Sequence, residues 1–511
     1  MPDNSSLIIL GIDAGDPELI QQFIAEGYLP AIRSIMERGW HARTGGPELF
    51  AEHGVWASIF SGQTRDQMGY YYFRQLKPGT YDIVPVSGMD ITAPPFWKAM
   101  AGGNLKAAII DVPDAYPVKG VPGAQLSNWA IHLGWVSNDP AFAPYAEPQS
   151  LLNEARIVFG ERHLITENSK ASVEQDKELF KQLLAQVEKK GKLCRHILAK
   201  DRYDLIFAVF HEAHTSAHQF WKYQSQAQGT NDARDDATLR NAIRDIYIAI
   251  DREFGRILAG APANANVFIV GSVGLKDYYP TAGLAEKALR LLGYQHSPPP
   301  GKVSFKPMDL ARRILPESVR IALSKRLSRE ARERIVAEQF RANIDWSRTT
   351  AFAIPTFYKT LIRINLRGRE PQGIVEPGKE YLELLGRIEA DFRSLIDPRT
   401  GKSAISDVQR AIDVFGKTPP AVLPDLLIEW KAPHFLERVV HPKGEIRQNK
   451  PEWYRPSDHT QHGFIAAAGP AFSERGVQND VLIPDLAPTF LSLLNLPIPS
   501  DLQGRPLFSA R

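Results

Sequence analysis

Histidines gather in one short segment of the chain. Three of the 13 histidines, His211, His214 and His218, fall within eight residues. His214 and His218 are four residues apart, and on a helix that spacing places both imidazoles on one face. Paired neutral imidazoles chelate Zn²⁺ and similar ions, and a third ligand from elsewhere would leave a coordination position open for catalysis. Surface or hydrogen-bonded histidines also occur at this spacing, so the pair alone indicates either a metal centre or a polar helix face.

Short apolar segments precede the polar candidates and predict the strands that position them. Strands are expected over 7–12, 106–111, 204–210, 266–271 and 464–468, with helices between them, for example over 176–198 and 235–258. This alternation predicts an α/β fold with a mostly parallel central sheet. Asp13 directly follows the first strand, at the sheet edge where such folds bind ligands. Asp16-Pro17-Glu18 predicts the start of the next helix.

Composition limits the classes of function. The 511 residues are 43% hydrophobic and 23% charged, which are ordinary values for a folded protein. With 61 basic and 58 acidic residues, the net charge is +3, so we expect no nucleic-acid polymer and no membrane as partner. The single cysteine, Cys194, excludes an intrachain disulfide framework. The chain begins without a signal-peptide pattern and has no apolar run of spanning length, so we expect a cytoplasmic protein.

Segments along nearly the whole chain resemble the alkaline phosphatase superfamily, in its type I phosphodiesterase/nucleotide pyrophosphatase branch. They are LIILGIDAGDPELI, VWASIFSGQTRDQMGYYYF, PPFWKAMAGGNLKAAIIDVPDAYPV, DLIFAVFHEAHTSAHQFW, VFIVGSVGL, RPSDHTQHGFIAAAGPAF and LIPDLAPTFLSLLNLPIPSDLQGRPL. The resemblance implies one alkaline-phosphatase-like α/β domain over 1–511, with helices flanking the sheet. The basic, helical stretch 298–351 interrupts the pattern and is expected to be an insertion, with a cap or a docking arm as alternatives.

The resemblance also implies ligands for a metal ion. Asp13 matches the aspartate after the family's first strand, and His218 matches the histidine of an Asp-x-x-x-His pair. His459 matches the histidine of a Gly-x-His segment in which Ser457 replaces the glycine, and His214 stands where the pair's aspartate would be. Three histidines are an accepted shell for catalytic zinc. The alternatives are a turn-capping role for Asp13 and a loop position for His459.

The second metal site and the nucleophile of that family are altered. Ser272 and Val273 occupy the positions of an Asp-His ligand pair, and Glu52 falls at the position of the nucleophilic threonine. Glu52 could serve as metal ligand, as general base for a water or as nucleophile, or it could cap the following helix. Asp277 could supply a substitute ligand, although an aspartate that starts a turn is the commoner case.

One arginine is a candidate for substrate binding. Arg74 follows the aromatic run 70–73, and its planar guanidinium could bind a phosphate or sulfate. Burial in a hydrophobic core is the commoner fate of such a run. Glycine-rich phosphate loops are absent from the sequence, which gives no support to nucleotide binding through those motifs.

These observations predict a metal-dependent hydrolase, or transferase, of a phosphoric ester or phosphodiester. One ion, zinc or alternatively manganese, would be held by Asp13, His214, His218 and His459, with Glu52 as the catalytic group and Arg74 on a small-molecule substrate. The alternative is a pseudo-enzyme of the same fold that binds a ligand or partner without turnover.

Overall fold

The structure, a computed structural model, describes residues 6–46, 53–132, 142–162, 165–224, 236–299, 329–416, 418–451, 454–472 and 475–508. Where the sequence predicts one domain, the chain divides into two compact units. Unit 1 comprises Met1–Met68, Ser87–Asp277 and Arg455–Arg511, and unit 2 comprises Gly69–Val86 and Tyr278–Tyr454. The division arises because the second set of residues builds sheets and a hydrophobic core of its own.

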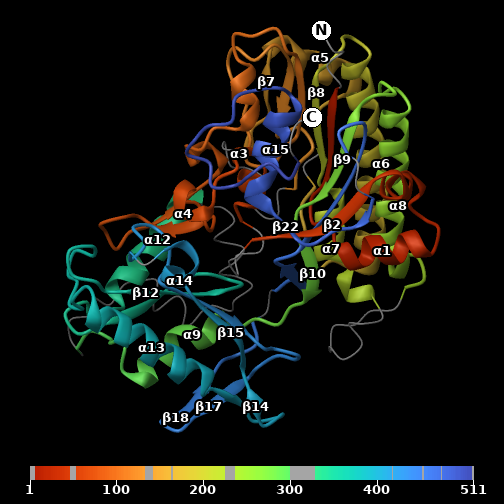
Figure 1. The fold of residues 1–511 in the computed structure, drawn as a ribbon. Coiled ribbons are helices and arrows are strands. Elements are labelled where there is room, and N and C mark those ends of the chain that lie inside the picture. The colour runs from red at the N-terminus through yellow and green to blue at the C-terminus, as the bar shows by residue number, and fades with distance from the viewer. Residues whose placement is uncertain are drawn as a thin grey trace. The chain divides into compact units, whose positions relative to one another are not determined.

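Unit 1 is built around a ten-stranded sheet (Figure 1). Its order is β21-β2-β20-β9-β1-β8-β5-β6-β7, with β22 paired to β2. The central strands β9, β1, β8, β5 and β6 are parallel, β20 is antiparallel to both β9 and β2, and β7 is antiparallel to β6. The edge strands β21 and β22 pair with β2 in parallel fashion. The bounds are β1 Leu7–Ile12, β2 Trp40–Gly45, β5 Ala107–Ile110, β6 Gly123–Ser127, β7 Tyr145–Glu147, β8 Leu205–Phe210, β9 Asn266–Gly271, β20 Gly463–Ala468, β21 Gly476–Val477 and β22 Val481–Leu482.

The strands predicted from apolar runs are confirmed, because β1, β8 and β9 are buried along their entire length. Strands buried on both faces are apolar throughout, which is why such a run identifies them. The helices of unit 1 are α1 Pro17–Ala25, α2 Pro30–Arg38, α3 Val55–Ser61, α4 Arg65–Met68, α5 Gln149–Phe159, α6 Val173–Leu198, α7 Glu212–Phe220, α8 Ala242–Leu258 and α15 Leu486–Leu493. Within the described part of the chain, every helix is too short or too polar to span a bilayer.

The start of α1 shows how local sequence fixes local structure. Asp16 is the N-cap residue, its side chain accepts a hydrogen bond from the backbone N–H of Leu19 at 2.7 Å, and Pro17 occupies the first helical position. This is the arrangement that the Asp-Pro-Glu sequence predicts. Burial raises the pKa of Asp16 to about 6. The helix therefore begins directly after the turn that carries Asp13, and holds that turn against the sheet.

Unit 2 contains short antiparallel sheets and three longer helices, α9 Ala282–Leu292, α12 Arg329–Ala342 and α13 Lys379–Arg393. Its remaining elements are β3 Arg74–Leu76, β4 Ile83–Pro85, β11 Ala351–Ile354, β12 Thr360–Ile364, β13 Ile396–Asp397, β14 Lys402–Ser403, β15 Ile405–Arg410, α14 Ala411–Phe415, β16 Leu426–Trp430, β17 Arg438–His441 and β18 Gly444–Arg447. Of the stretch 298–351 that the sequence predicts to be a helical insertion, 300–328 lie outside the described residues. The described remainder includes α12.

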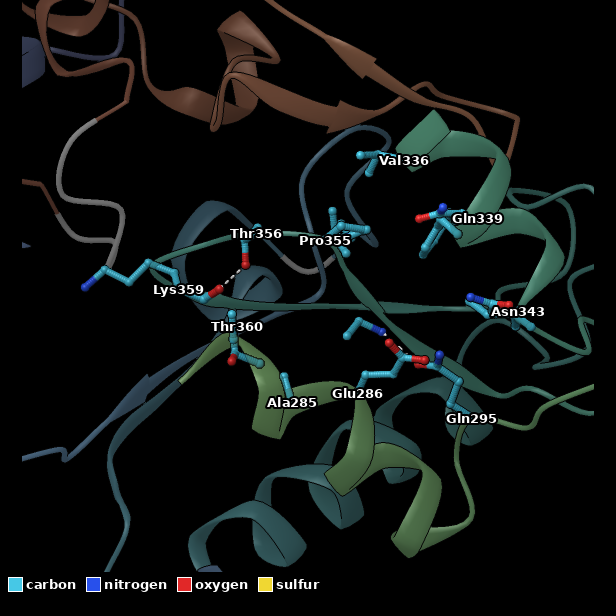
Figure 2. Close-up of a pocket in the computed structure, with 15 residues that line it drawn as sticks. Ala285, Glu286, Gln295, Val336, Gln339, Asn343, Pro355, Thr356, Lys359 and Thr360 are labelled. Atoms are coloured by element: carbon cyan, nitrogen blue, oxygen red, sulfur yellow. Dashed lines mark hydrogen bonds between the residues drawn. The ribbon is translucent and has the colours of Figure 1, made fainter. Parts of the chain in front are cut away.

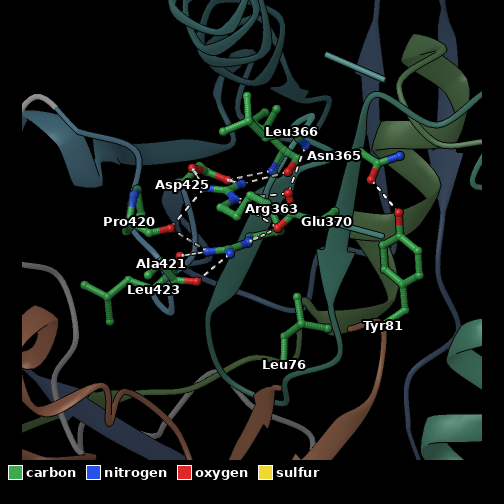
Figure 3. Close-up of polar contacts among 12 residues, drawn as sticks. Leu76, Tyr81, Arg363, Asn365, Leu366, Glu370, Pro420, Ala421, Leu423 and Asp425 are labelled. Carbon is green, nitrogen blue, oxygen red and sulfur yellow. Dashed lines mark hydrogen bonds and ion pairs between the residues drawn. The ribbon is translucent and has the colours of Figure 1, made fainter. Parts of the chain in front are cut away.

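A buried network of ion pairs lies in unit 2 at the four-stranded sheet β11-β12-β16-β15 (Figure 3). The Arg363 guanidinium, 1% exposed, donates to Glu370 at 2.8 Å and to the backbone carbonyl of Ala421 at 2.7 Å. Asp425 accepts from both terminal nitrogens of Arg369 at 2.7 and 2.8 Å. A buried charge is tolerated only with such compensation, so this network has a structural role in unit 2.

Candidate metal centre

The predicted ligands come from elements that end at one edge of the unit 1 sheet. Asp13 follows β1, and His211 follows its parallel neighbour β8. Helix α7 begins at Glu212 and carries His214 and His218, four residues apart on one face. His459 lies on β19 (Ser457–Thr460), which pairs with β10 (Gly274–Asp277), the strand that follows β9. The sheet edge that Asp13 indicated is therefore where the histidines meet.

The three imidazoles converge on one point. His214 Nε2 lies 3.0 Å from His218 Nε2, and His459 Nε2 lies 3.2 and 3.1 Å from these two atoms. All three residues are at most 5% exposed. Among the described residues they form the group of histidine, cysteine or carboxylate side chains that could hold a metal ion.

Hydrogen bonds at the opposite ring nitrogens fix the tautomers of two of these histidines. His214 Nδ1 lies 2.8 Å from Asp13 Oδ2, an acceptor, so this nitrogen carries the proton. His218 Nδ1 lies 2.9 Å from Ser457 Oγ. Because that hydroxyl donates its own proton to the carbonyl of Ala217 at 3.1 Å, it must accept from His218.

The third histidine follows the same pattern. His459 Nδ1 faces the backbone carbonyl of Gly274 at 3.2 Å and can only donate to it. In all three neutral rings the Nε2 atom therefore presents a lone pair to the other two. Three lone pairs at 3.0–3.2 Å repel one another unless a positive charge lies among them. Two nitrogens bound tetrahedrally to zinc at about 2.0–2.1 Å are about 3.3 Å apart, so the donor set fits a divalent ion.

Asp13 lies behind the imidazoles and outside the group of converging donors. Its Oδ2 accepts from His214 and faces His211 Nδ1 at 3.3 Å. Its Oδ1 accepts from the Trp56 indole at 2.7 Å and from the Ser272 hydroxyl at 3.1 Å. Burial alone would raise the pKa of Asp13, but electrostatic attraction and hydrogen bonds from His214 and His211 hold it well below its usual range. Asp13 thus orients a ligand as a carboxylate partner of histidine, rather than completing the donor group as the sequence predicts.

The residues at the altered second site have definite contacts. The Ser272 hydroxyl accepts from the backbone N–H of Ala14 at 2.9 Å while it donates to Asp13. Val273 is 2% exposed, and its side chain has no ligand atom. Asp277, the last residue of β10, accepts from the Trp221 indole at 2.7 Å. None of these three belongs to the group that could hold an ion in the described part of the chain.

An arginine that the sequence analysis missed lies on this site. Arg455 Nη1 donates to His218 Nε2 at 2.8 Å, and Nη2 donates to Asp458 Oδ1 at 3.2 Å. Burial lowers the pKa of His218 well below its usual range, and the positive charge of Arg455 adds to this effect. His218 is therefore neutral near pH 7, which is the state that a metal ligand requires.

Two further titratable groups near the histidines were also missed. The His132 ring stacks on His214 with centroids 4.0 Å apart, and its Nε2 lies 3.3 Å from a Glu167 oxygen. Burial, together with the negative charge of Asp13, raises the pKa of Asp114 to about 6. Asp114 follows the apolar strand β5, so its position after an apolar run was an available signal, whereas His132 follows β6, whose sequence GAQLS is not an apolar run.

A buried lysine supports the elements that carry the site. Lys190 of α6 is fully buried, and its ammonium donates to the backbone carbonyl of Val209 in β8 at 3.0 Å. It lies 3.4 Å from Asp111, whose carboxylate accepts from the backbone N–H groups of Trp129 and Ala130 at 2.7 and 2.9 Å. The lysine thereby joins the end of β8 to the segment that leads to His132.

Two predicted site residues are not among the contacts described around the histidines. Glu52 lies outside the described residues. Arg74 belongs to unit 2, where its guanidinium donates to both oxygens of Glu333 at 2.6 and 2.8 Å. Its side chain is 10% exposed and lies near the Phe73 and Phe357 rings, at 5.4 and 5.1 Å from their centroids. The guanidinium that accompanies the three histidines is that of Arg455.

A separate cavity of about 280 Å³ lies within unit 2 (Figure 2). It is lined by α9, α12 and the segment around β11 and β12. Of the described residues that line it, Glu286 accepts from Arg290 at 2.9 Å and Lys359 donates to Glu429 at 3.2 Å. The three histidines belong to unit 1, and none of them lines this cavity.

Comparison with solved structures identifies the fold. The phosphonoacetate hydrolase of Sinorhizobium meliloti 1021, in complexes with phosphonoformate and phosphonoacetate, aligns with 96% of this chain over 96% of its own. The sequence identities are 13% and 14%, and the TM-scores are 0.51 and 0.50. A murine ectonucleotide pyrophosphatase/phosphodiesterase 5 aligns with 97% of this chain over 96% of its own, at 13% identity and a TM-score of 0.44. Neither a family model nor a curated protein sequence matches the chain. The predicted alkaline-phosphatase-like α/β fold is confirmed.

Proposed function

We propose that this protein is a metal-dependent hydrolase of phosphoric esters. The main support is that the Nε2 atoms of His214, His218 and His459 lie 3.0–3.2 Å from one another. The Nδ1–H group of each ring donates to an acceptor of its own, which leaves a lone pair on each Nε2. Three neutral imidazoles favour zinc, and they leave a coordination position open, as catalytic sites do and structural sites do not. The fold shared with a phosphonate hydrolase makes a phosphorus oxyanion the first substrate class to test.

An ion on these histidines would supply a Lewis acid for a phosphoryl oxygen. The chain's own groups do the rest. Asp13 and Ser457 hold the ligand rings in one tautomer and one orientation. Asp114, whose carboxylate senses the charge of Asp13 and whose pKa is raised by burial to about 6, is a candidate for proton transfer near neutral pH. Glu52, at the sequence position of the family's nucleophile, stays a candidate for the base or nucleophile.

A non-catalytic function is the second candidate, and one observation favours it. Both Asp13 oxygens are engaged by His214, Trp56 and Ser272, so the carboxylate is not presented to a second ion. In that case the three histidines would hold an ion for ligand binding without turnover.

Metal content and hydrolysis together separate these candidates. Elemental mass spectrometry of untagged protein should find about one zinc or manganese ion per chain. The ion should be lost in His218→Ala and retained in His296→Ala, a histidine of unit 2. Zinc-dependent hydrolysis of p-nitrophenyl phosphate or bis(p-nitrophenyl) phosphate, absent in His218→Ala, would establish the enzyme. One ion without hydrolysis of either ester would favour the non-catalytic function, and no ion after purification with zinc and manganese would contradict both.

A further inference from the structure

The peptide group that joins Gly274 to Leu275 connects a histidine of the site to a second carboxylate. Its carbonyl oxygen accepts from Nδ1 of His459 at 3.2 Å. Its N–H group donates to Oδ2 of Asp16 at 2.6 Å. Because the C=O and N–H groups of a trans peptide point in opposite directions, this peptide lies between the imidazole and the carboxylate.

Asp16 is well fixed for this contact. The residue is 3% exposed, its Oδ1 accepts from the backbone N–H of Leu19 at 2.7 Å, and its own N–H donates to the Tyr247 hydroxyl at 3.1 Å. A Cβ atom added to Gly274 would lie 2.9 Å from Asp16 Oδ2 and 2.3 Å from Oγ1 of Thr460. Glycine at position 274 therefore lets the carboxylate and β19 approach the same peptide closely.

The partners of the three ligand rings can now be compared. His214 donates from Nδ1 to the Asp13 carboxylate, and His218 donates from Nδ1 to Ser457. A carboxylate that accepts from a ligand histidine orients the ring and raises its basicity. The partner of His459 is a neutral carbonyl, but this carbonyl belongs to a chain of hydrogen bonds that ends in a carboxylate. Hydrogen bonds in such a chain polarise one another, so the charge at the N–H end makes the carbonyl a stronger acceptor.

We propose that Asp16 is a positioning residue of the metal centre, which orients the His459 ring and strengthens it as a ligand through the Gly274–Leu275 peptide. This inference rests on the proposed function and adds a residue that acts on a ligand through the backbone. The turn after β1 would then support two of the three ligands. Asp13 accepts from one ring directly, and Asp16 acts on another through β10.

Zinc affinity of Asp16→Asn, measured against a chromophoric chelator at pH 7.5, tests the proposal. The substitution removes the charge and replaces one of the two acceptor oxygens by an NH₂ donor. We expect zinc affinity to fall by about tenfold, the lower end of the range for an outer partner of a ligand. In ¹⁵N spectra of histidine-labelled, zinc-loaded protein, the Nδ1–H signal of His459, assigned from His459→Gln, should shift. The signals of His214 and His218 should stay in place, which a general loss of stability would not produce.

Asp251→Asn is the matched control, because Asp251 is also a buried carboxylate of unit 1 that accepts from two backbone N–H groups. These belong to Ala31 and Ile32, at 3.0 and 2.8 Å, and burial raises the pKa of Asp251 to about 6, as it does for Asp16. The control should lose stability but keep wild-type zinc affinity.

Two results would overturn the inference while leaving the metal centre intact. One is wild-type zinc affinity with an unshifted His459 signal in Asp16→Asn, and the other is an equal loss of affinity in Asp251→Asn. If circular dichroism shows that Asp16→Asn is unfolded, Asp16→Ser gives the same test, because serine retains the helix cap. Absence of zinc binding in wild type would instead overturn the proposed function, and the inference with it.

Discussion

The hydroxyl of Ser457 accepts a hydrogen bond from Nδ1 of His218 at 2.9 Å and donates one to the backbone carbonyl of Ala217. The two residues are 239 positions apart in the chain. Ser457 falls at the position where the family that the sequence resembles is expected to carry glycine. The serine thus gives one ring of the candidate metal centre a hydrogen bond that a glycine could not make.

Replacing Ser457 by alanine should weaken zinc binding. Loss of an outer partner of a metal-bound histidine typically lowers affinity by about 10- to 100-fold. Competition against a chromophoric chelator measures this. Ser216→Ala is the control, because the Ser216 hydroxyl also bonds a backbone carbonyl in α7 but contacts no ligand ring in the described structure. Equal zinc affinity in Ser457→Ala and wild type would show that the hydroxyl does not orient His218.

The Asp13 carboxylate, which accepts from Nδ1 of His214, should affect zinc affinity as strongly as Ser457 does. In Asp13→Asn the amide can offer one oxygen, and we expect zinc affinity to fall by about 10- to 100-fold. Trp56→Phe removes only the indole donor at 2.7 Å from Oδ1, so its effect should be smaller. Trp97→Phe controls for the loss of a buried indole away from Asp13. A larger loss in Trp56→Phe than in Asp13→Asn would mean that ring packing, rather than the carboxylate, maintains the site.

The depressed pKa of His218 predicts how stability changes with pH in the metal-free protein. An unfolded histidine takes up a proton below about pH 6.5, whereas folded His218 does not, so the unfolded state gains stability as pH falls. This histidine should therefore lower the free energy of unfolding by about 1 kcal/mol between pH 7.5 and 5.5. Urea denaturation of chelator-treated wild type and His218→Gln at both pH values measures the difference. A pH dependence that is equal in the two proteins would contradict the depressed pKa.

Close packing of two glycines sets the position of the Asp13 turn. A Cβ atom added to Gly271 would lie 2.3 Å from the carbonyl oxygen of Gly15. Gly271→Ala should therefore push the β1 turn away from Ser272 and destabilise the protein by about 1–3 kcal/mol, with weaker zinc binding. Gly255→Ala is the control: its Cβ would meet Ala31 at an ordinary 3.6 Å, and in a helix alanine adds up to about 1 kcal/mol of stability. Denaturation midpoints and zinc titrations of both variants test this prediction. Wild-type stability and zinc affinity in Gly271→Ala would contradict it.

The strands of the unit 1 sheet could be predicted from sequence because strands buried on both faces are apolar runs. The His214–His218 pair could be predicted because its spacing is a property of one helix. Arg455 could not, because its contact with His218 joins residues 237 positions apart. The strands of unit 2 could not be predicted in the same way, because they are short and some, such as β15, are only partly buried, so no strong period marks them.

The pairing of β10 with β19 places Asp277 opposite Ser457. Residues 278–454 are therefore inserted in the sequence between two strands that are neighbours in space. His218 and His459 are 241 residues apart, and their contact closes a loop that contains this entire insertion. When a ribosome has added residue 454 to the growing chain, it has made all of unit 2 but has not yet made His459. The three-histidine site can form only after residue 459 has been made, when synthesis of unit 2 is already complete, so zinc binding by a growing chain would report that this part of the chain has joined the unit 1 sheet.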